Sequence, residues 1–114
     1  MRRLAIGLVT IAVASVWLVT AAAPAGAHAA IESTDPANGE LLEEPPSQIV
    51  LTFTEPPDID LTIVSVIDSS GAKMPTGPPE RAPGSNREIH VRLDPLPDGV
   101  YTVTWRTVSA TDGH

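Results

Sequence analysis

The stretch "QIVLTFTEPPD", Gln48–Asp58, decides how this chain folds. Its first part alternates, so that Ile49, Leu51 and Phe53 lie on one side of an extended strand and the intervening residues lie on the other. The proline pair then ends the strand, because proline has no N–H to donate to a β-ladder. A strand with one apolar face is typical of an antiparallel sheet that packs that face on a core.

Other short strands are expected before and after this one. They are Ala29–Ser33, Leu61–Asp68, Glu88–Leu93 and Val100–Ala110. The proline-rich segment Lys73–Arg87 is predicted to be a long surface loop, and no stretch has the apolar repeat of an amphipathic helix. Five or six short strands, separated by turns at intervals of about ten residues, predict an all-β fold, a Greek-key β-sandwich or barrel.

Side-chain positions follow from the same alternation. Tyr101, Val103, Trp105 and Thr107 should share one face of the last strand. Trp105 is predicted to be a core residue, and Tyr101 is a candidate for a corner hydrogen bond. His90 alternates with apolar neighbours, which places it on the solvent face of its strand rather than in a metal site.

The N-terminal region has the organisation of a secretory signal. Met1–Arg3 is basic, Leu4–Ala23 is apolar and uncharged, and Pro24 is followed by the small residues Ala25-Gly26-Ala27. We expect cleavage after Ala27, which divides the chain into a signal peptide, residues 1–27, and one exported domain, residues 28–114. The alternative is an uncleaved membrane anchor. After cleavage the domain begins at His28, which then carries a free α-amine.

Composition restricts the partners of this domain. The chain has 14 acidic and 7 basic residues, a formal net charge of -7 and no cysteine. Such a surface repels nucleic acid and anionic lipid. Without thiolates, a metal ion can be held only by imidazole, amine, carboxylate or thioether groups, and Met74 is the one methionine beyond the leader. No hydrolase, phosphate-loop or zinc motif is present.

Two end motifs resemble the CopC family of exported copper-resistance proteins. They are "HAAIESTDPANGELLEEPPSQIVLTFTEP", His28–Pro56, and "LPDGVYTVTWRTVSATDGH", Leu96–His114. The resemblance implies a cupredoxin-like or immunoglobulin-like β-sandwich that binds Cu(II). Family members continue with a proline and one more strand, so the resemblance predicts a sandwich short of its final strand, either as a shortened chain or as part of a longer membrane fusion.

The resemblance also implies the copper ligands. They are the amine and imidazole of His28, together with Asp112 and His114. Glu55 matches a carboxylate that lies beside the ligands in that family. From the residues alone, Glu55 is either a solvated carboxylate at a strand end or an orienting partner of a metal-bound amine or water.

The chemistry of these groups suits cupric copper. An α-amine and its own imidazole close a chelate ring, and one more imidazole and a carboxylate complete a tetragonal nitrogen and oxygen set, which favours Cu(II) over Cu(I). Asp112 and His114 are separated by a single glycine, and in extended backbone residues i and i+2 point to the same side.

The leading hypothesis is therefore an exported or periplasmic, monomeric Cu(II) carrier that is not an enzyme. It would serve copper resistance and homeostasis and pass copper to a membrane transporter of the CopD type. One alternative is a copper-dependent oxidative enzyme, since lytic polysaccharide monooxygenases also begin with an amine–imidazole brace. Another is a metal-free immunoglobulin-like adhesion module or the periplasmic face of a membrane protein.

Overall fold

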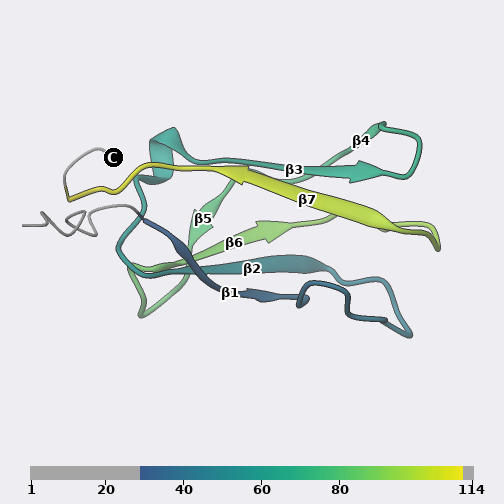
Figure 1. The fold of residues 1–114 in the computed structure, drawn as a ribbon, viewed down its shortest axis with the longest axis horizontal. Coiled ribbons are helices and arrows are strands. Elements are labelled where there is room, and N and C mark those ends of the chain that lie inside the picture. The colour runs from purple at the N-terminus through teal and green to yellow at the C-terminus, as the bar shows by residue number, and fades with distance from the viewer. Residues whose placement is uncertain (1–28, 112–114) are drawn as a thin grey trace, which may run out of the picture.

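Two antiparallel sheets stack face to face in the computed structural model, which describes residues 29–111 (Figure 1). The first sheet has the order β1–β2–β6–β5, with bounds Ile31–Asp35, Gln48–Phe53, Glu88–Arg92 and Glu80–Arg81. The second has the order β4–β3–β7, with bounds Lys73–Met74, Ile63–Asp68 and Tyr101–Arg106. One 3-10 turn, η1 (Ile59–Leu61), precedes β3. The all-β prediction is confirmed.

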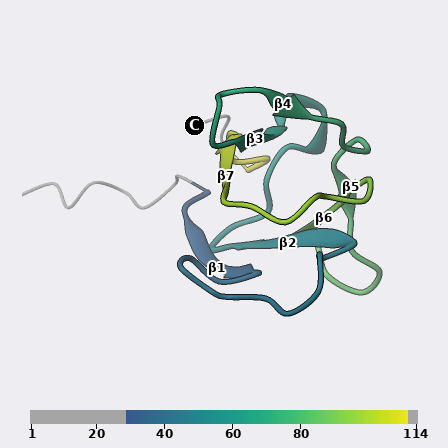
Figure 2. The ribbon, with the colours of Figure 1, turned by 90° about the vertical axis from the view of Figure 1, so that its right-hand side faces the viewer.

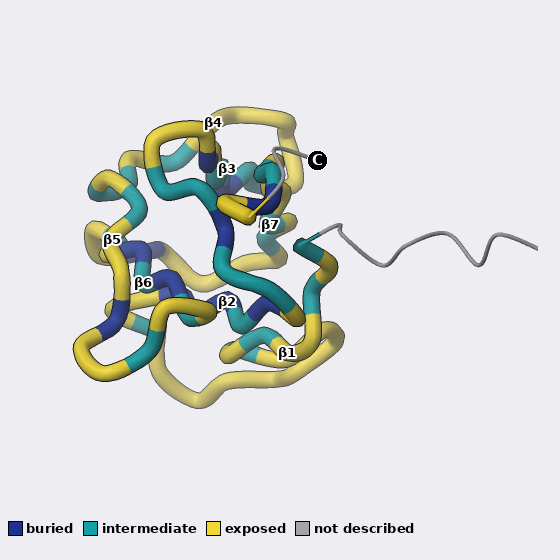
Figure 3. The backbone as a smooth tube through the Cα atoms, turned by 90° about the vertical axis from the view of Figure 1, so that its left-hand side faces the viewer, coloured by how far each residue is buried: buried dark blue, intermediate teal, exposed yellow. Residues whose placement is uncertain are grey.

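Strand β2 lies at the centre of the first sheet, paired with β1 on one side and β6 on the other. Its alternation is observed as predicted, because Ile49, Leu51 and Phe53 are all buried. They pack with Ile89 and Val91 of β6 and, from the second sheet, Val66 of β3. Figure 3 shows these buried positions along the strands, with exposed loops around them.

The chain passes from one sheet to the other between β2 and β3, between β4 and β5, and between β6 and β7. Figure 2 shows the resulting layers, with the β4–β3–β7 sheet lying over β1, β2 and β6. Such crossings, in place of an uninterrupted meander, are those of a Greek-key sandwich. No helix in residues 29–111 is long and apolar enough to cross a membrane.

The segment Lys73–Arg87 is more regular than predicted. It contains β4 and β5, two short strands that pair with β3 and β6. Three of its four prolines, Pro75, Pro78 and Pro79, lie between the two strands, and Pro83 lies after β5, so no proline occupies a ladder position in either strand. The first strand was expected at Ala29–Ser33 and is observed two residues later. Its register runs from Ile31 opposite Phe53 to Asp35 opposite Val50.

The prediction that Trp105 is a core residue is wrong. Trp105 is 39% exposed: it lies on β7, the last strand of its sheet in the described part of the chain, and it lines an open cleft. The other two assignments are confirmed. The Tyr101 hydroxyl donates a hydrogen bond to the Pro97 carbonyl, and His90 lies on the outer side of β6, with Nε2 2.7 Å from Oε1 of Glu88.

Candidate metal centre

The predicted ligands His28, Asp112 and His114 lie outside the described residues, as does the leader. The backbone that leads to them is described on both sides, up to Ala29 at the N-terminal side and Thr111 at the C-terminal side. We call the backbone at Ala29 and Ala30 the N-terminal approach and the backbone from Val108 to Thr111 the C-terminal approach. The arrangement of these two approaches around Glu55 is the part of the predicted site that the structure describes.

A five-residue segment, Thr54–Asp58, links β2 to η1 and so carries the chain from the first sheet to the second; we call it the crossover segment. Its first residue holds the N-terminal approach. The backbone N–H of Ala30 donates to Oγ1 of Thr54 over 3.2 Å, and the N–H of Thr54 donates to the Ala30 carbonyl over 2.8 Å. The chain just before β1 is thereby fixed beside the start of the crossover segment.

The same segment holds the C-terminal approach. Beyond β7 the chain runs antiparallel to the crossover segment, with an isolated β-bridge between Pro57 and Ser109. The Asp58 N–H donates to the Val108 carbonyl over 2.9 Å, and the Ala110 N–H donates to the Pro56 carbonyl over 2.8 Å. Proline lacks an N–H but keeps its carbonyl, so the pair that ends β2 still accepts a hydrogen bond from the end of the chain.

Glu55 lies in the middle of the crossover segment and is half-buried. Its Oε2 accepts a hydrogen bond of 3.0 Å from Oγ of Ser109, a side chain that is only 1% exposed. Oγ of Ser109 in turn accepts the N–H of Thr111 over 3.1 Å. The Glu55 carboxylate is thus not simply solvated, because it is bonded to the chain that leads to Asp112.

Side chains outside the two approaches also hold the crossover segment through hydrogen bonds to its carbonyls. Nη2 of Arg81, on β5, donates to the Pro57 carbonyl over 2.9 Å. Oγ1 of Thr62, a buried side chain, donates to the Asp58 carbonyl over 2.6 Å and lies 2.8 Å from Oγ1 of Thr107. No pattern in the sequence indicated these contacts. Arg81 meets Pro57 across 24 residues and Thr62 meets Thr107 across 45, although Thr62 also bonds Asp58, four residues away.

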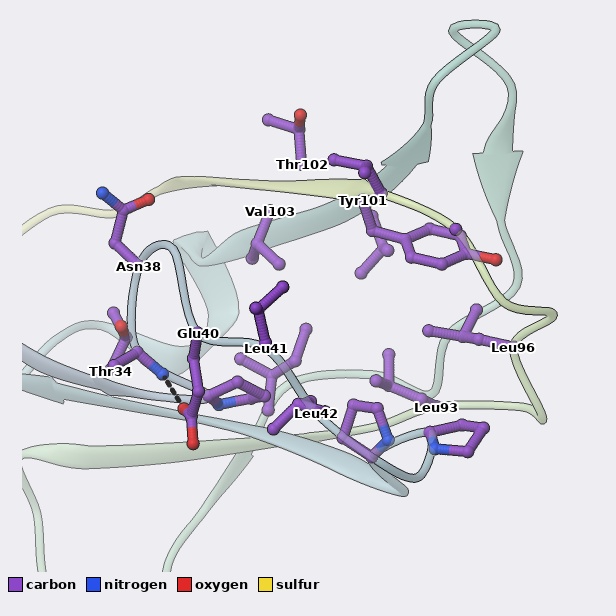
Figure 4. Close-up of a pocket in the computed structure, with 18 of the residues that line it drawn as sticks. Thr34, Asn38, Glu40, Leu41, Leu42, Leu93, Leu96, Tyr101, Thr102 and Val103 are labelled. Carbon is purple, nitrogen blue, oxygen red and sulfur yellow. Dashed lines mark hydrogen bonds between the residues drawn. The ribbon is translucent and has the colours of Figure 1, made fainter.

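A second feature lies at the other end of the sandwich. It is an open cleft of about 910 Å³ between the β1–β2 loop and the start of β7 (Figure 4). Its walls are mainly apolar side chains, including Leu41, Leu42, Leu93, Leu96 and Val103. Within residues 29–111 no group of three His, Asp or Glu side chains could hold a metal ion, in this cleft or elsewhere. The acidic residues Glu40, Glu43 and Glu44 are exposed and also line this cleft.

Comparison with known proteins decides the family. Residues 31–114 match the model of the CopC domain. The chain belongs to the CopC family. It is 33% identical over 89 residues to the copper transport protein CutJ of Bacillus subtilis, an alignment that covers 77% of this chain and 16% of CutJ. The chain therefore spans about a sixth of the length of this curated relative.

Solved CopC-family structures have the same fold. CopC from Methylosinus trichosporium OB3b superposes with a TM-score of 0.70 at 23% identity, covering 76% of this chain and 83% of that one. The copper resistance protein PcoC from Escherichia coli superposes with a TM-score of 0.60 at 28% identity, covering 74% and 87%. The predicted family and sandwich are confirmed. Of these relatives, CutJ is a copper transport protein and PcoC is a copper resistance protein.

Proposed function

We propose that this chain is an exported Cu(II)-binding protein that sequesters or carries copper for copper resistance and homeostasis. The family assignment supports copper as the cargo, since CutJ is a copper transport protein and PcoC a copper resistance protein. The proposed ligands are His28, through its α-amine and imidazole, Asp112 and His114. The apolar leader and the small residues before His28 support export to the periplasm or cell envelope and processing at that residue.

One observation carries the proposal: both approaches to the predicted ligands are bound to the crossover segment. Ala30 is held by Thr54, and Ala110 is held by Pro56. His28 precedes Ala30 by two residues, and Asp112 follows Ala110 by two residues. Two residues span at most about 7 Å. His28 and Asp112 are therefore each within two residues of backbone that is bonded to the same segment, as one metal site shared by His28 and Asp112 requires.

The proposed chemistry is binding without turnover. The amine and imidazole of His28 chelate one face of the ion, and Asp112 and His114 complete a nitrogen and oxygen set suited to Cu(II). Because each ligand must be deprotonated, binding weakens as the pH falls. Glu55 acts on the ligands rather than on copper: its carboxylate, held by Ser109, orients the amine or a bound water.

Delivery to a membrane copper transporter of the CopD type is the proposed fate of the metal. The match to CutJ supports it, because a region of a copper transport protein aligns with most of this chain. The acidic composition, with a net charge of -7, supports a metal cargo rather than nucleic acid as partner. We propose that the carrier acts as a monomer.

The test compares the chain processed at His28 with the same chain acetylated at its α-amine. Acetylation converts the α-amine into an amide and breaks the chelate while leaving every side chain in place. We expect at least a tenfold loss of Cu(II) affinity in a competition titration and a changed Cu(II) EPR spectrum. His90→Gln, a change at the outer face of β6, is the matched histidine control and should leave both unchanged. Equal affinity and spectra in the processed and acetylated chains would overturn the proposal.

A further inference from the structure

One buried hydroxyl connects the two parts of the candidate centre. We infer that Ser109 is a positioning residue for the copper site, which it serves by joining the Glu55 carboxylate to the backbone turn at Thr111. The inference rests on the proposed function, because it concerns how the proposed ligands are presented. Ser109 stands in the C-terminal motif that resembles the CopC family, but neither the alternation nor that resemblance assigned a role to its side chain.

A serine hydroxyl has one proton to donate and lone pairs to accept with, and both roles are used here. The proton goes to Oε2 of Glu55 over 3.0 Å, and the oxygen accepts the Thr111 N–H over 3.1 Å. Ser109 is 1% exposed, so bulk water does not compete for either bond. A hydroxyl in this setting fixes the direction of the carboxylate and of the turn together.

The backbone of Ser109 does not depend on its hydroxyl. It is held by the bridge to Pro57 and by the flanking hydrogen bonds from Asp58 to Val108 and from Ala110 to Pro56. Removing the hydroxyl should therefore leave this stretch paired while releasing what lies on either side, namely the Glu55 carboxylate and the N–H of Thr111. Thr111 directly precedes Asp112, so the loss falls on the approach to two proposed ligands.

The experiment uses the chain processed at His28 and the variant Ser109→Ala, with Cu(II) as the probe. We expect the Cu(II) affinity to fall about 10- to 100-fold, the range for losing an outer partner of metal ligands, with an altered EPR spectrum. In the metal-free variant the Thr111 amide should lose its protection from hydrogen exchange. Ser109→Thr, which keeps the hydroxyl, should retain both the affinity and the spectrum.

Two further variants separate positioning from general damage. Val66→Ala creates a cavity at a buried residue of β3 and should lower stability without changing Cu(II) affinity below the unfolding transition. Glu55→Ala removes the other partner of the same bond, and its loss of affinity should not add to that of Ser109→Ala.

The outcomes distinguish the two proposals. If the unaltered chain binds Cu(II) through its processed end and Ser109→Ala matches it in affinity, spectrum and Thr111 exchange, the positioning role is overturned and the proposed function stands. A fully additive loss in the double variant also overturns the role. If the unaltered chain binds no Cu(II), the proposed function fails and the inference fails with it.

Discussion

Two leucines provide a stringent test of the sandwich, because the same substitution should have very different effects at the two positions. Leu51 is in the middle of β2 and is 0% exposed, whereas Leu41 is in the β1–β2 loop and is 97% exposed. Leu51→Ala and Leu41→Ala remove the same three carbon atoms. Any difference between the variants therefore measures burial rather than the chemistry of the substitution.

The expected cost at Leu51 follows from that burial. Three buried carbons contribute about 2.4 kcal/mol of transfer free energy, and the residual cavity adds to this. Leu51 also lines the open cleft, which gives neighbouring side chains room to relax, so we expect about 3 kcal/mol in total. At Leu41 we expect less than about 0.5 kcal/mol. A domain of this size has about 4 to 12 kcal/mol of stability, so the Leu51 variant loses a large share of it.

Urea denaturation followed by tryptophan fluorescence is the assay. The sequence has two tryptophans, Trp17 and Trp105, so in a chain that begins at His28 the signal comes from a single site on β7. The Leu51→Ala midpoint should move well below that of the unaltered chain, with an unchanged slope, while the Leu41→Ala midpoint should stay in place. Midpoints that shift equally in the two variants would refute the placement of β2 in the core.

Two more predictions concern turns. The pKa of Asp68 is lowered by the Ser70 hydroxyl and by the Ala72 N–H, so this carboxylate stabilises the fold at neutral pH and the effect is lost as the pH falls through its folded-state pKa. Asp68→Asn should therefore be less stable than the unaltered chain at pH 7. The urea midpoints of the two proteins should converge as the pH is taken below about 4. A difference between the midpoints that stays constant with pH would contradict this. Tyr101→Phe removes the hydrogen bond to Pro97 and should lower the free energy of unfolding by about 1 kcal/mol in the same assay. The control Thr102→Val, at an outward-facing residue, should lower it by no more than about 0.5 kcal/mol. Equal losses in the two variants would show that the hydrogen bond of Tyr101 contributes nothing.

The strands that the sequence predicts well are those whose own side chains determine burial. Strand β2 is one of these, because its alternation is long and it ends at a proline pair. Strand β7 was predicted as Val100–Ala110 and is observed as Tyr101–Arg106. Residues beyond Arg106 have β-type composition, but their partner is the crossover segment rather than β3. Composition indicates an extended backbone; it does not indicate which neighbour the backbone pairs with.

The candidate site divides in the same way. His28, Asp112, His114 and Glu55 could be proposed because the resemblance to a known family implies a role for each of them. It implied none for the hydroxyls of Thr54 and Ser109, which stand in the same two motifs. Thr54 meets Ala30 across 24 residues of sequence, and Ser109 meets Glu55 across 54. Contacts of that range are made by the fold and leave no local pattern.

The proline pair explains why the proposed site, which combines residues from both sides of the domain's sequence, is compatible with this fold. Pro56 and Pro57 cannot extend the β2 ladder, so the chain leaves the first sheet after the hydrogen bonds between Thr54 and Ala30. The carbonyls freed by that departure are the ones that hold Ala110 and Arg81. The feature that ends a core strand therefore also anchors the C-terminal approach, beside the residue that anchors the N-terminal one. A cupric ion bound by both ends would close the whole domain into a loop, so on the proposed function copper binding must also raise the free energy of unfolding.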